Sequence, residues 1–575
     1  MMNQAHPQDR RIVVGVDSSH GSEVVGTQDK PAEVRTTVAE GPAAHVLSTA
    51  AAGGMSPVSP STTRILVRKR LGAACAPMLH RRGVAVAMAV VMAGLFGLAA
   101  GWWTPRGPLT TSAALTSIGV SLLVGTVAGM VMRSRWAMLL APVTFAVVFE
   151  TARMGTDGPM VDGIHPGSTY GIVAFVLGRG IHALLALLPM LLGATLGAAA
   201  ARHLDRARQR ARQPIRTGRW VRRAVTVLAI LGVVTLTAAL ARPARTPAIV
   251  TADGQPVAGS VAELTRVQIG GHDLAVQIRG TDAADPVLLF LAGGPGGTEM
   301  GAMRRHGQGL EQDFVVATFD QRGTGKSYDN LQPTSTLTLA RAVRDAVEIT
   351  NYLRERFHQD KVYVVGNSWG TILGVLAVQQ HPELFHAFVG TGQMVSPRET
   401  DRIFYQDTLA WARRTDNAAL VDTLTASGPP PYGKVLDYEA ALTLADQVHP
   451  YDRSGNDEGA GGFSENLFVE EYTLLEQVHN LPAFLDVFAV LYPQLQDIDF
   501  RTDVPKLDVP VYLVQGRHEL PGRAVLAEQW FRTLDAPTKE MIVFDTAGHR
   551  ALFERPDLFH KVMTDTVLRE AQLKR

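Results

Sequence analysis

Hydrophobic and polar positions divide the chain into two unlike halves. Between residues 83 and 241, long runs without charged residues alternate with short basic segments. From about residue 260 onward, short apolar runs alternate with longer amphipathic stretches, as in an ordinary globular domain. The first pattern predicts helices that span a membrane. The second predicts alternating strands and helices.

Five apolar runs in the first half are each expected to form a transmembrane helix. Crossing a ~30 Å hydrocarbon core takes about 20 residues at 1.5 Å each, and the third run is a marginal span by that measure. None resembles a cleaved signal peptide, because the first lies far inside the chain and others follow it. The runs cover residues 83–103, 111–132, 136–149, 180–201 and 224–241.

Basic residues flank these runs unevenly, which predicts their orientation. They lie before the first run, between the second and third, and between the fourth and fifth, where nine arginines fall within residues 202–223. The other two loops carry one arginine each, Arg106 and Arg153. Because basic loops stay in the cytoplasm, five spans place the C-terminal half outside it. Omitting the third span would move the most basic loop outside, so the charge pattern favours five.

The arginine-rich loop raises the question of a nucleic-acid partner. Its position between two apolar runs favours contact with lipid headgroups instead, so we expect a lipid bilayer and no nucleic acid as partners.

Cys75 is the single cysteine, which excludes an internal disulfide framework and a multi-cysteine metal site. The expected location is therefore a cell membrane crossed several times, with an extracytoplasmic C-terminal domain.

Composition also predicts the domain boundaries. Residues 1–63 are rich in Ala, Gly, Ser, Thr and Pro and predict a disordered tail. Within it, residues 11–19 resemble the first strand of a universal stress protein, but the rest of such a domain is missing, which favours a chance match. The membrane region then covers residues 64–242, a linker covers 243–259, and the globular domain covers 260–575.

Short apolar strands, each followed by a loop or helix, predict a parallel sheet with helices on both faces. About 120 residues separate the strand near Phe388 from the next one, far more than an ordinary connection. We therefore expect a helical cap inserted over about residues 396–502. The predicted strands cover residues 286–291, 314–320, 362–365, 511–515 and 541–544.

The segment Gly366-Asn-Ser-Trp-Gly370 fits G-x-S-x-G and lies between a predicted strand and a predicted helix. In this motif the serine lies on a strained strand-to-helix turn, so the flanking positions need minimal side chains. Ser368 is therefore the candidate nucleophile. An oxyanion hole needs two backbone N–H groups. The candidates are Trp369, which follows the serine, and Gly294, in the glycine-rich turn after an earlier strand.

A nucleophilic serine needs a base and an orienting carboxylate. Glu519 and His549 follow the last two predicted strands, and we assign them as acid and base. His518 is the rival base, although its loop fits that role poorly. Asp545 is the alternative acid, although its position suits the capping of a turn.

Four motifs together resemble the proline iminopeptidase family of α/β-hydrolases. They are Gly293-Gly-Pro-Gly296, Asp320-Gln-Arg-Gly-Thr-Gly-Lys-Ser327, Gly366-Asn-Ser-Trp-Gly370 and Gly548-His549. The resemblance implies an α/β-hydrolase fold, doubly wound and mostly parallel, with Ser368 as nucleophile and His549 as base. The family commonly has His where this chain has Ala292, and Asp where it has Glu519. Cap glutamates hold the substrate's amine in the family, and Glu470 and Glu471 are the candidates here.

We therefore expect a membrane-anchored serine hydrolase, an aminopeptidase that cleaves N-terminal residues from peptides. A carboxylesterase acting on small acyl esters is the alternative enzyme, and a catalytically silent sensor domain is the alternative outside enzymes. No cofactor is expected. Residues 323–327 resemble the end of a P-loop, but Asp320 stands where that motif needs glycine. No metal is expected either. His518-Glu519 resembles the beginning of a zinc-protease helix motif, but Gly522 stands where that motif needs its second histidine.

Overall fold

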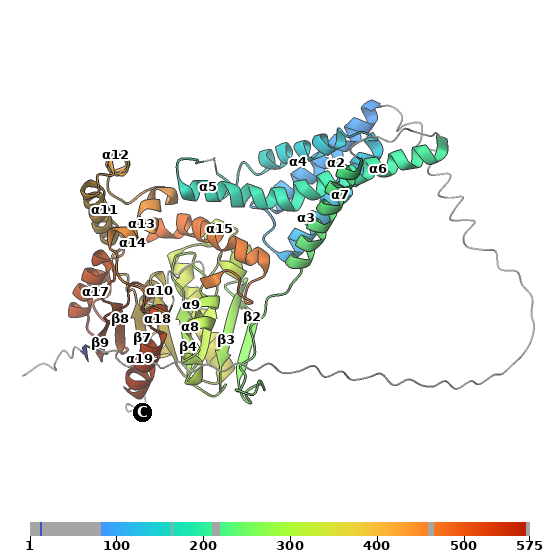
Figure 1. Cartoon of the computed structure of the whole chain (residues 1–575). Helices are drawn as coiled ribbons and strands as arrows, with labels where there is room; N and C mark the ends of the chain where they lie inside the picture. Colours follow the sequence, from blue (N-terminus) through green and yellow to red (C-terminus); the bar gives the residue numbers. More distant parts are fainter. Residues whose placement is uncertain (1–11, 14–81, 163–164, 210–218, 458–464, 571–575) are drawn as a thin grey trace, which may run out of the picture. The chain divides into compact units, whose positions relative to one another are not determined.

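The computed structural model of the chain describes residues 12–13, 82–162, 165–209, 219–457 and 465–570 (Figure 1). The predicted tail, residues 1–63, lies outside these ranges apart from the two-residue strand β1 (Ile12–Val13). Cys75 and residues 210–218 of the arginine-rich loop also lie outside the described residues.

Apolar helices occupy the predicted membrane region. Among the described residues, five helical segments are long and apolar enough to cross a membrane: residues 82–103, 111–132, 169–205, 223–240 and 474–495. The first four match predicted spans, although the third of them begins well before residue 180. The predicted marginal span is the shorter helix α4. The helices are α2 (Arg82–Trp103), α3 (Thr111–Met132), α4 (Ala137–Ala152), α5 (Thr169–Phe175), π-helical η1 (Val176–Gly180) and η2 (Ala183–Leu187), α6 (Leu188–Gln209) and α7 (Arg219–Leu240).

Helices α3 and α6 pack through glycines spaced four residues apart. A Cβ on Gly125 would lie 2.0 Å from the Met190 carbonyl oxygen, and one on Gly129 would lie 2.2 Å from that of Ala194. On the facing helix, a Cβ on Gly197 would lie 2.0 Å from the Thr126 carbonyl oxygen. Small residues at this spacing allow the backbones to approach closely, an arrangement common between helices in membranes.

The described strands form one nine-stranded sheet in the order β1-β9-β8-β7-β6-β4-β5-β3-β2. The pairs from β5 through β4, β6, β7, β8 and β9 to β1 are parallel, whereas β2–β3 and β3–β5 are antiparallel. The predicted mostly parallel sheet is confirmed. Its strands are β2 (Val261–Ile269), β3 (His272–Gly280), β4 (Val287–Leu291), β5 (Val315–Phe319), β6 (Val362–Asn367), β7 (Phe385–Thr391), β8 (Val511–Gly516) and β9 (Lys539–Phe544).

Helices cover both faces of this sheet. In β4, Leu289 faces a core shared with α9, α10 and α17, whereas Phe290 faces a core shared with α8, α18 and α19. Because both faces are buried, the central strands are continuously apolar. The helices are α8 (Met300–His306), α9 (Leu339–Phe357), α10 (Trp369–Gln380), α17 (Pro521–Thr533), α18 (Ala551–Glu554) and α19 (Pro556–Val562).

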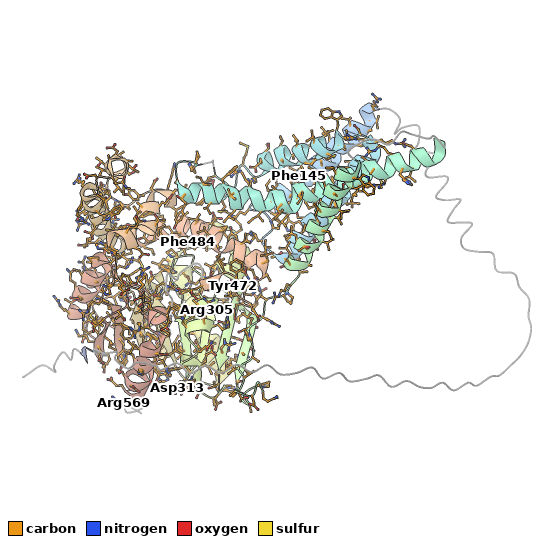
Figure 2. The ribbon with its side chains drawn as sticks, viewed as in Figure 1. Phe145, Arg305, Asp313, Tyr472, Phe484 and Arg569 are labelled. Atoms are coloured by element: carbon orange, nitrogen blue, oxygen red, sulfur yellow. The ribbon has the colours of Figure 1, made fainter. Side chains whose placement is uncertain are left out.

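A helical insertion separates β7 from β8 and contains the apolar segment 474–495. Figure 2 labels Phe484, which belongs to α15 of this insertion. Its Cα would lie 2.8 Å from a Cβ placed on Gly296, so α15 packs directly on the glycine-rich turn after β4. The helices are α11 (Pro397–Arg414), α12 (Ala418–Ser427), α13 (Glu439–Thr443), α14 (Ala445–Val448), α15 (Leu474–Leu491) and α16 (Phe500–Asp503).

Candidate active site

Four loops meet where the parallel strands end. They are the glycine-rich turn after β4, the serine turn after β6, and the loops after β8 and β9, which carry Glu519 and His549. A cavity of about 440 Å³ lies among them and is lined by Ser368, Glu519, His549 and Gly294. Residues predicted on four separate loops therefore share one cavity.

Ser368 has a backbone conformation that non-glycine residues rarely adopt, with φ 53° and ψ −119°. Such a conformation costs roughly 1–3 kcal/mol and persists only where the surroundings enforce it. Here the Ser368 N–H donates to the Thr391 carbonyl oxygen at 2.9 Å. A Cβ on Gly366 would lie 2.6 Å from the Gly370 carbonyl oxygen, so the turn excludes larger flanking residues. The Ser368 hydroxyl contacts the Met394 thioether sulfur at 3.8 Å.

The two predicted oxyanion donors come from the serine turn and the glycine-rich turn. Trp369 is the first residue of α10, where a backbone N–H has no acceptor within its own helix. Gly294 has φ 132°, a conformation that favours glycine. The Gln321 amide donates to the Ala292 carbonyl oxygen at 3.1 Å and accepts from the Trp369 indole at 2.8 Å. Gln321 thus connects the glycine-rich turn to the serine turn, a role that sequence reasoning missed.

His549 and Glu519 are in direct contact. The His549 Nδ1 lies 2.6 Å from a Glu519 carboxylate oxygen, so Nδ1 carries the proton and Nε2 is left as the basic nitrogen. Burial raises the pKa of the Glu519 carboxyl, but the charges of Arg523 and His549 outweigh it and hold that pKa well below its usual range. The carboxylate therefore stays ionised beside the imidazole.

The rival residues have other partners. His518 stacks on Tyr451, with ring centroids 4.8 Å apart. Asp545 forms a half-exposed ion pair with Arg517 at 2.5 Å. The structure therefore brings Glu519 to His549 and gives Asp545 a different cation.

Two buried carboxylates that sequence reasoning missed anchor the loops of the site. Glu299 accepts a hydrogen bond from the Gly293 N–H at 3.1 Å and forms an ion pair with Arg550. Glu554 accepts from the Gly548 N–H at 2.8 Å and from the Tyr451 hydroxyl at 2.9 Å. No motif marks either residue, because each acts through contacts that only the folded chain creates.

The two predicted cap glutamates do not line the cavity. Glu470 pairs with Arg245 of the linker at 2.8 Å, on the surface. Glu471 is fully buried and pairs with Arg304 at 2.6 Å. Each therefore faces an arginine and not the cavity lining, and their expected contact with a substrate amine stays a prediction.

A different insertion carboxylate does line the cavity. Asp401 of α11 accepts hydrogen bonds from the Tyr492 hydroxyl at 2.7 Å and the Gln496 amide at 3.4 Å, both neutral donors. Burial raises the pKa of Asp401 to about 7, although these hydrogen bonds and the charge of Arg523 lower it. A buried carboxylate without a cationic partner among the described residues is suited to a cationic ligand.

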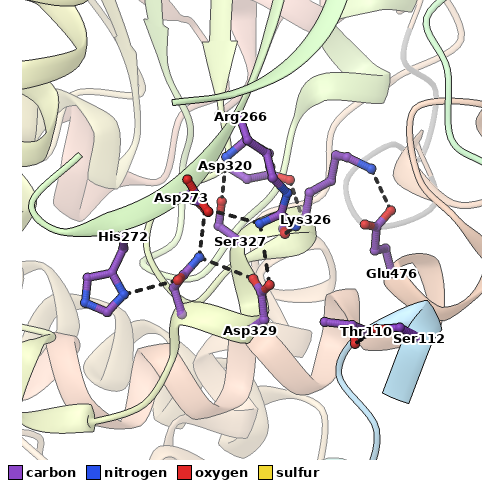
Figure 3. Close-up of polar contacts among 12 residues, drawn as sticks. Thr110, Ser112, Arg266, His272, Asp273, Asp320, Lys326, Ser327, Asp329 and Glu476 are labelled. Atoms are coloured by element: carbon purple, nitrogen blue, oxygen red, sulfur yellow. Dashed lines mark hydrogen bonds and ion pairs between the residues drawn. The ribbon is translucent and has the colours of Figure 1, made fainter. Parts of the chain in front are cut away.

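The segment that resembles the end of a P-loop forms polar contacts with neighbouring protein side chains (Figure 3). Lys326 pairs with Glu476 at 2.8 Å, and the Lys326 N–H donates to the Asp320 carboxylate at 2.7 Å. The Tyr472 hydroxyl also donates to Asp320, and burial raises the pKa of Asp320 to about 7. In the described part of the chain, no group of three or more His, Cys, Asp or Glu side chains is placed to hold a metal ion.

Known proteins match the C-terminal half. A model of the alpha/beta hydrolase fold matches residues 286–556. The probable aminopeptidase YbaC of Bacillus subtilis is 30% identical over 319 residues, 54% of this chain and 97% of that protein. A probable proline iminopeptidase of Leptolyngbya boryana is 30% identical over 290 residues, 48% of this chain and 85% of that protein. The crystal structure of a proline iminopeptidase-related protein from Thermus thermophilus has a TM-score of 0.39 and 20% identity, and the match covers 54% of this chain and 99% of that one.

Proposed function

Because this chain belongs to the α/β-hydrolase family and is a hydrolase homologous to aminopeptidases and proline iminopeptidases, we propose that it is a membrane-anchored serine aminopeptidase. One observation carries the mechanism: a His549–Glu519 pair and the strained Ser368 turn line the same cavity. The aminopeptidase names belong to the relatives, and their substrate class is extended to this chain as part of the proposal.

In the proposed reaction, Ser368 is the nucleophile. His549 Nε2 takes the Ser368 proton as the oxygen attacks the scissile carbonyl, and it later gives that proton to the leaving amine. Glu519 stabilises the imidazolium that forms, through its contact with Nδ1. The Trp369 and Gly294 N–H groups bind the developing oxyanion. A water molecule, activated by the same histidine, then hydrolyses the acyl-enzyme.

Asp401 supplies the proposed preference for a free N-terminus. It lines the cavity, it is buried, and its hydrogen-bond partners are neutral. A substrate α-ammonium group would provide the cation that the carboxylate lacks. A charge-assisted hydrogen bond between these two groups would be stronger than one between neutral groups.

A fluorophosphonate probe tests the serine mechanism directly, since it reacts with the activated serine of such enzymes. We expect the purified full-length protein to be labelled and the Ser368→Ala variant to be unlabelled while keeping its thermal unfolding temperature. Loss of the nucleophile should reduce hydrolysis by several orders of magnitude. Equal labelling of wild type and variant would overturn the assignment. A folded wild type that is neither labelled nor active would favour the silent sensor.

The proposed anchor rests on the exposed faces of the N-terminal helices. Leu95, Leu123 and Leu228 are each more than 60% exposed, whereas a helix surface that faces water is mostly polar. Glycine-mediated packing of α3 on α6 is consistent with this environment. From the arginine distribution we propose five spans, with the α4 segment as the third, and an extracytoplasmic hydrolase domain.

A further inference from the structure

The Glu519 carboxylate has a second ionic partner besides His549. One oxygen, Oε2, lies 2.6 Å from His549 Nδ1. The other, Oε1, accepts from the Arg523 Nε at 2.9 Å and from the Leu520 N–H at 2.7 Å. The two oxygens therefore have separate tasks, one toward the imidazole and one toward the beginning of α17.

Burial makes this second partner important. The Glu519 side chain is 2% exposed, and that of Arg523 is 19% exposed. A buried ionised carboxylate is costly unless it is paired and hydrogen-bonded. Glutamate also has three side-chain torsions to fix, so one contact with a mobile imidazole cannot define where its carboxylate lies. The Arg523 contact supplies both the charge and a second fixed direction.

The position of Arg523 in its helix points to the same pairing. It lies in the first turn of α17, where the helix dipole disfavours a cation. Leu520, the residue just before α17, offers no side-chain cap to that helix end. Glu519 provides a compensating negative charge four residues before Arg523 and accepts the Leu520 N–H. Helix end, arginine and carboxylate thus form one unit.

We propose that Arg523 is a positioning residue for this enzyme: its guanidinium holds the Glu519 carboxylate in the orientation that orders the His549 imidazole. The inference rests on the proposed function, since it concerns the triad of that mechanism. Arg523 acts through Glu519 and not on the substrate, even though part of its side chain lines the cavity.

The low pKa of the Glu519 carboxyl agrees with this geometry, because Arg523 is the largest favourable charge acting on it. Removing the arginine takes a positive charge away from the Glu519–His549 pair, so adding a proton to the pair costs less. The acidic limb of the pH profile should therefore move to higher pH. Other titratable or charged groups that line this cavity include Glu299, Asp401, Tyr451, His518, Arg550 and Glu554.

The test compares Arg523→Met, Arg523→Lys and Glu519→Gln in the full-length protein with a small p-nitrophenyl ester. We expect Arg523→Met to lower kcat/KM roughly 10- to 100-fold, as a displacement of about 1 Å in a catalytic group does. Its acidic limb should move up by roughly half a pH unit or more. Arg523→Lys, which keeps the charge, should return the limb close to its wild-type position.

Two comparisons make the test decisive. In a Glu519→Gln background, Arg523→Met should cost less than threefold, because its effect passes through Glu519; an undiminished loss would overturn the proposal and favour direct substrate binding. Arg517→Met removes the nearby exposed pair with Asp545 and should leave rate and limb unchanged.

An unshifted limb in a folded Arg523→Met variant also overturns the proposal. If Arg523→Met fails to fold, the Arg523→Lys variant decides instead. Wild-type kcat/KM in that variant would overturn the proposal. A wild type that the fluorophosphonate does not label defeats the proposed function itself, which separates the two failures.

Discussion

Replacing Asp401 by asparagine tests the proposed recognition of a free N-terminus with almost no change of shape. A charge-assisted hydrogen bond contributes roughly 1.5–3 kcal/mol, so its loss should lower kcat/KM for free-amine substrates roughly 10- to 150-fold. Small esters and N-acetylated amides lack the ammonium group and should be cleaved at wild-type rates. The selectivity ratio, free over acetylated, is therefore the quantity to measure.

The pKa of Asp401 gives the same experiment a pH signature. Because burial raises that pKa to about 7, the carboxylate ionises and attracts an ammonium group only as pH rises through that value. Effects of pH on the shared catalytic residues are common to both substrates and cancel in the ratio. Between about pH 5 and pH 7.5, where a peptide α-amine with a pKa near 8 stays mostly protonated, the wild-type ratio should rise, whereas the Asp401→Asn ratio should stay flat.

Stability offers a second readout that does not depend on substrate. A carboxyl whose folded pKa is raised stabilises the fold below its unfolded pKa, near 4, and loses that contribution as pH rises to about 7. Wild type should therefore lose stability relative to Asp401→Asn across this window and hold a constant difference above it. Chemical denaturation at several pH values measures this.

A matched control comes from the cap glutamate that the structure places elsewhere. Glu470 pairs with Arg245 on the surface, so Glu470→Gln should leave the selectivity ratio unchanged. The reasoning about Asp401 fails if its asparagine variant keeps the wild-type ratio at pH 8. It fails equally if Glu470→Gln abolishes that ratio.

Three further predictions concern the backbone and the membrane region. Gly392→Ala would place a Cβ 2.7 Å from His549 Nδ1 and should reduce kcat at least tenfold, whereas Gly254→Ala, also at positive φ but in open space, should not; steady-state kinetics decides. Gly129→Leu should separate α3 from α6 and lower the unfolding temperature in detergent by several degrees, whereas Gly119→Leu on the open face of α3 should have little effect, and equal unfolding temperatures would contradict the packing argument. Cys75, the only thiol, should resist a membrane-impermeant maleimide in intact spheroplasts and react after lysis, and labelling before lysis would refute the five-span orientation.

Local pattern was enough to predict much of the fold. Strand β4 is continuously apolar because helices bury both of its faces, and such a run is visible in any sequence. Helix α9 begins after the capping residue Thr338, whose side chain accepts from the Arg341 N–H. The strained turn at Ser368 was equally accessible, since its spacing encodes the steric requirement. The bounds of the antiparallel strands β2 and β3 were not predicted, because their pairing depends on contacts that local periodicity does not show.

Long-range charge pairing was not accessible in the same way. Glu470 and Glu471 were candidates because cap glutamates hold the substrate's amine in the family that the motifs resemble. Their partners, Arg245 and Arg304, lie more than 150 residues away in sequence, and no local pattern forecasts such pairs. Asp401 looks like any aspartate on an amphipathic helix until α15 and the following turn place Tyr492 and Gln496 against it. The one signal that was available was the four-residue spacing of Glu519 and Arg523, which matches ion pairing on a helix.

The order of the candidate site comes from connections between loops more than from any single loop. Gln321 connects the turns that carry Ala292 and Trp369. Glu299 connects the glycine-rich turn to Arg550, the residue after His549. Arg523 connects the acid loop to α17. Each connection is buried or nearly so, so breaking it leaves a polar group without a partner and costs more than the contact itself contributes. A site assembled from strand ends can thus keep its geometry, because each loop is restrained by a side chain from its neighbour.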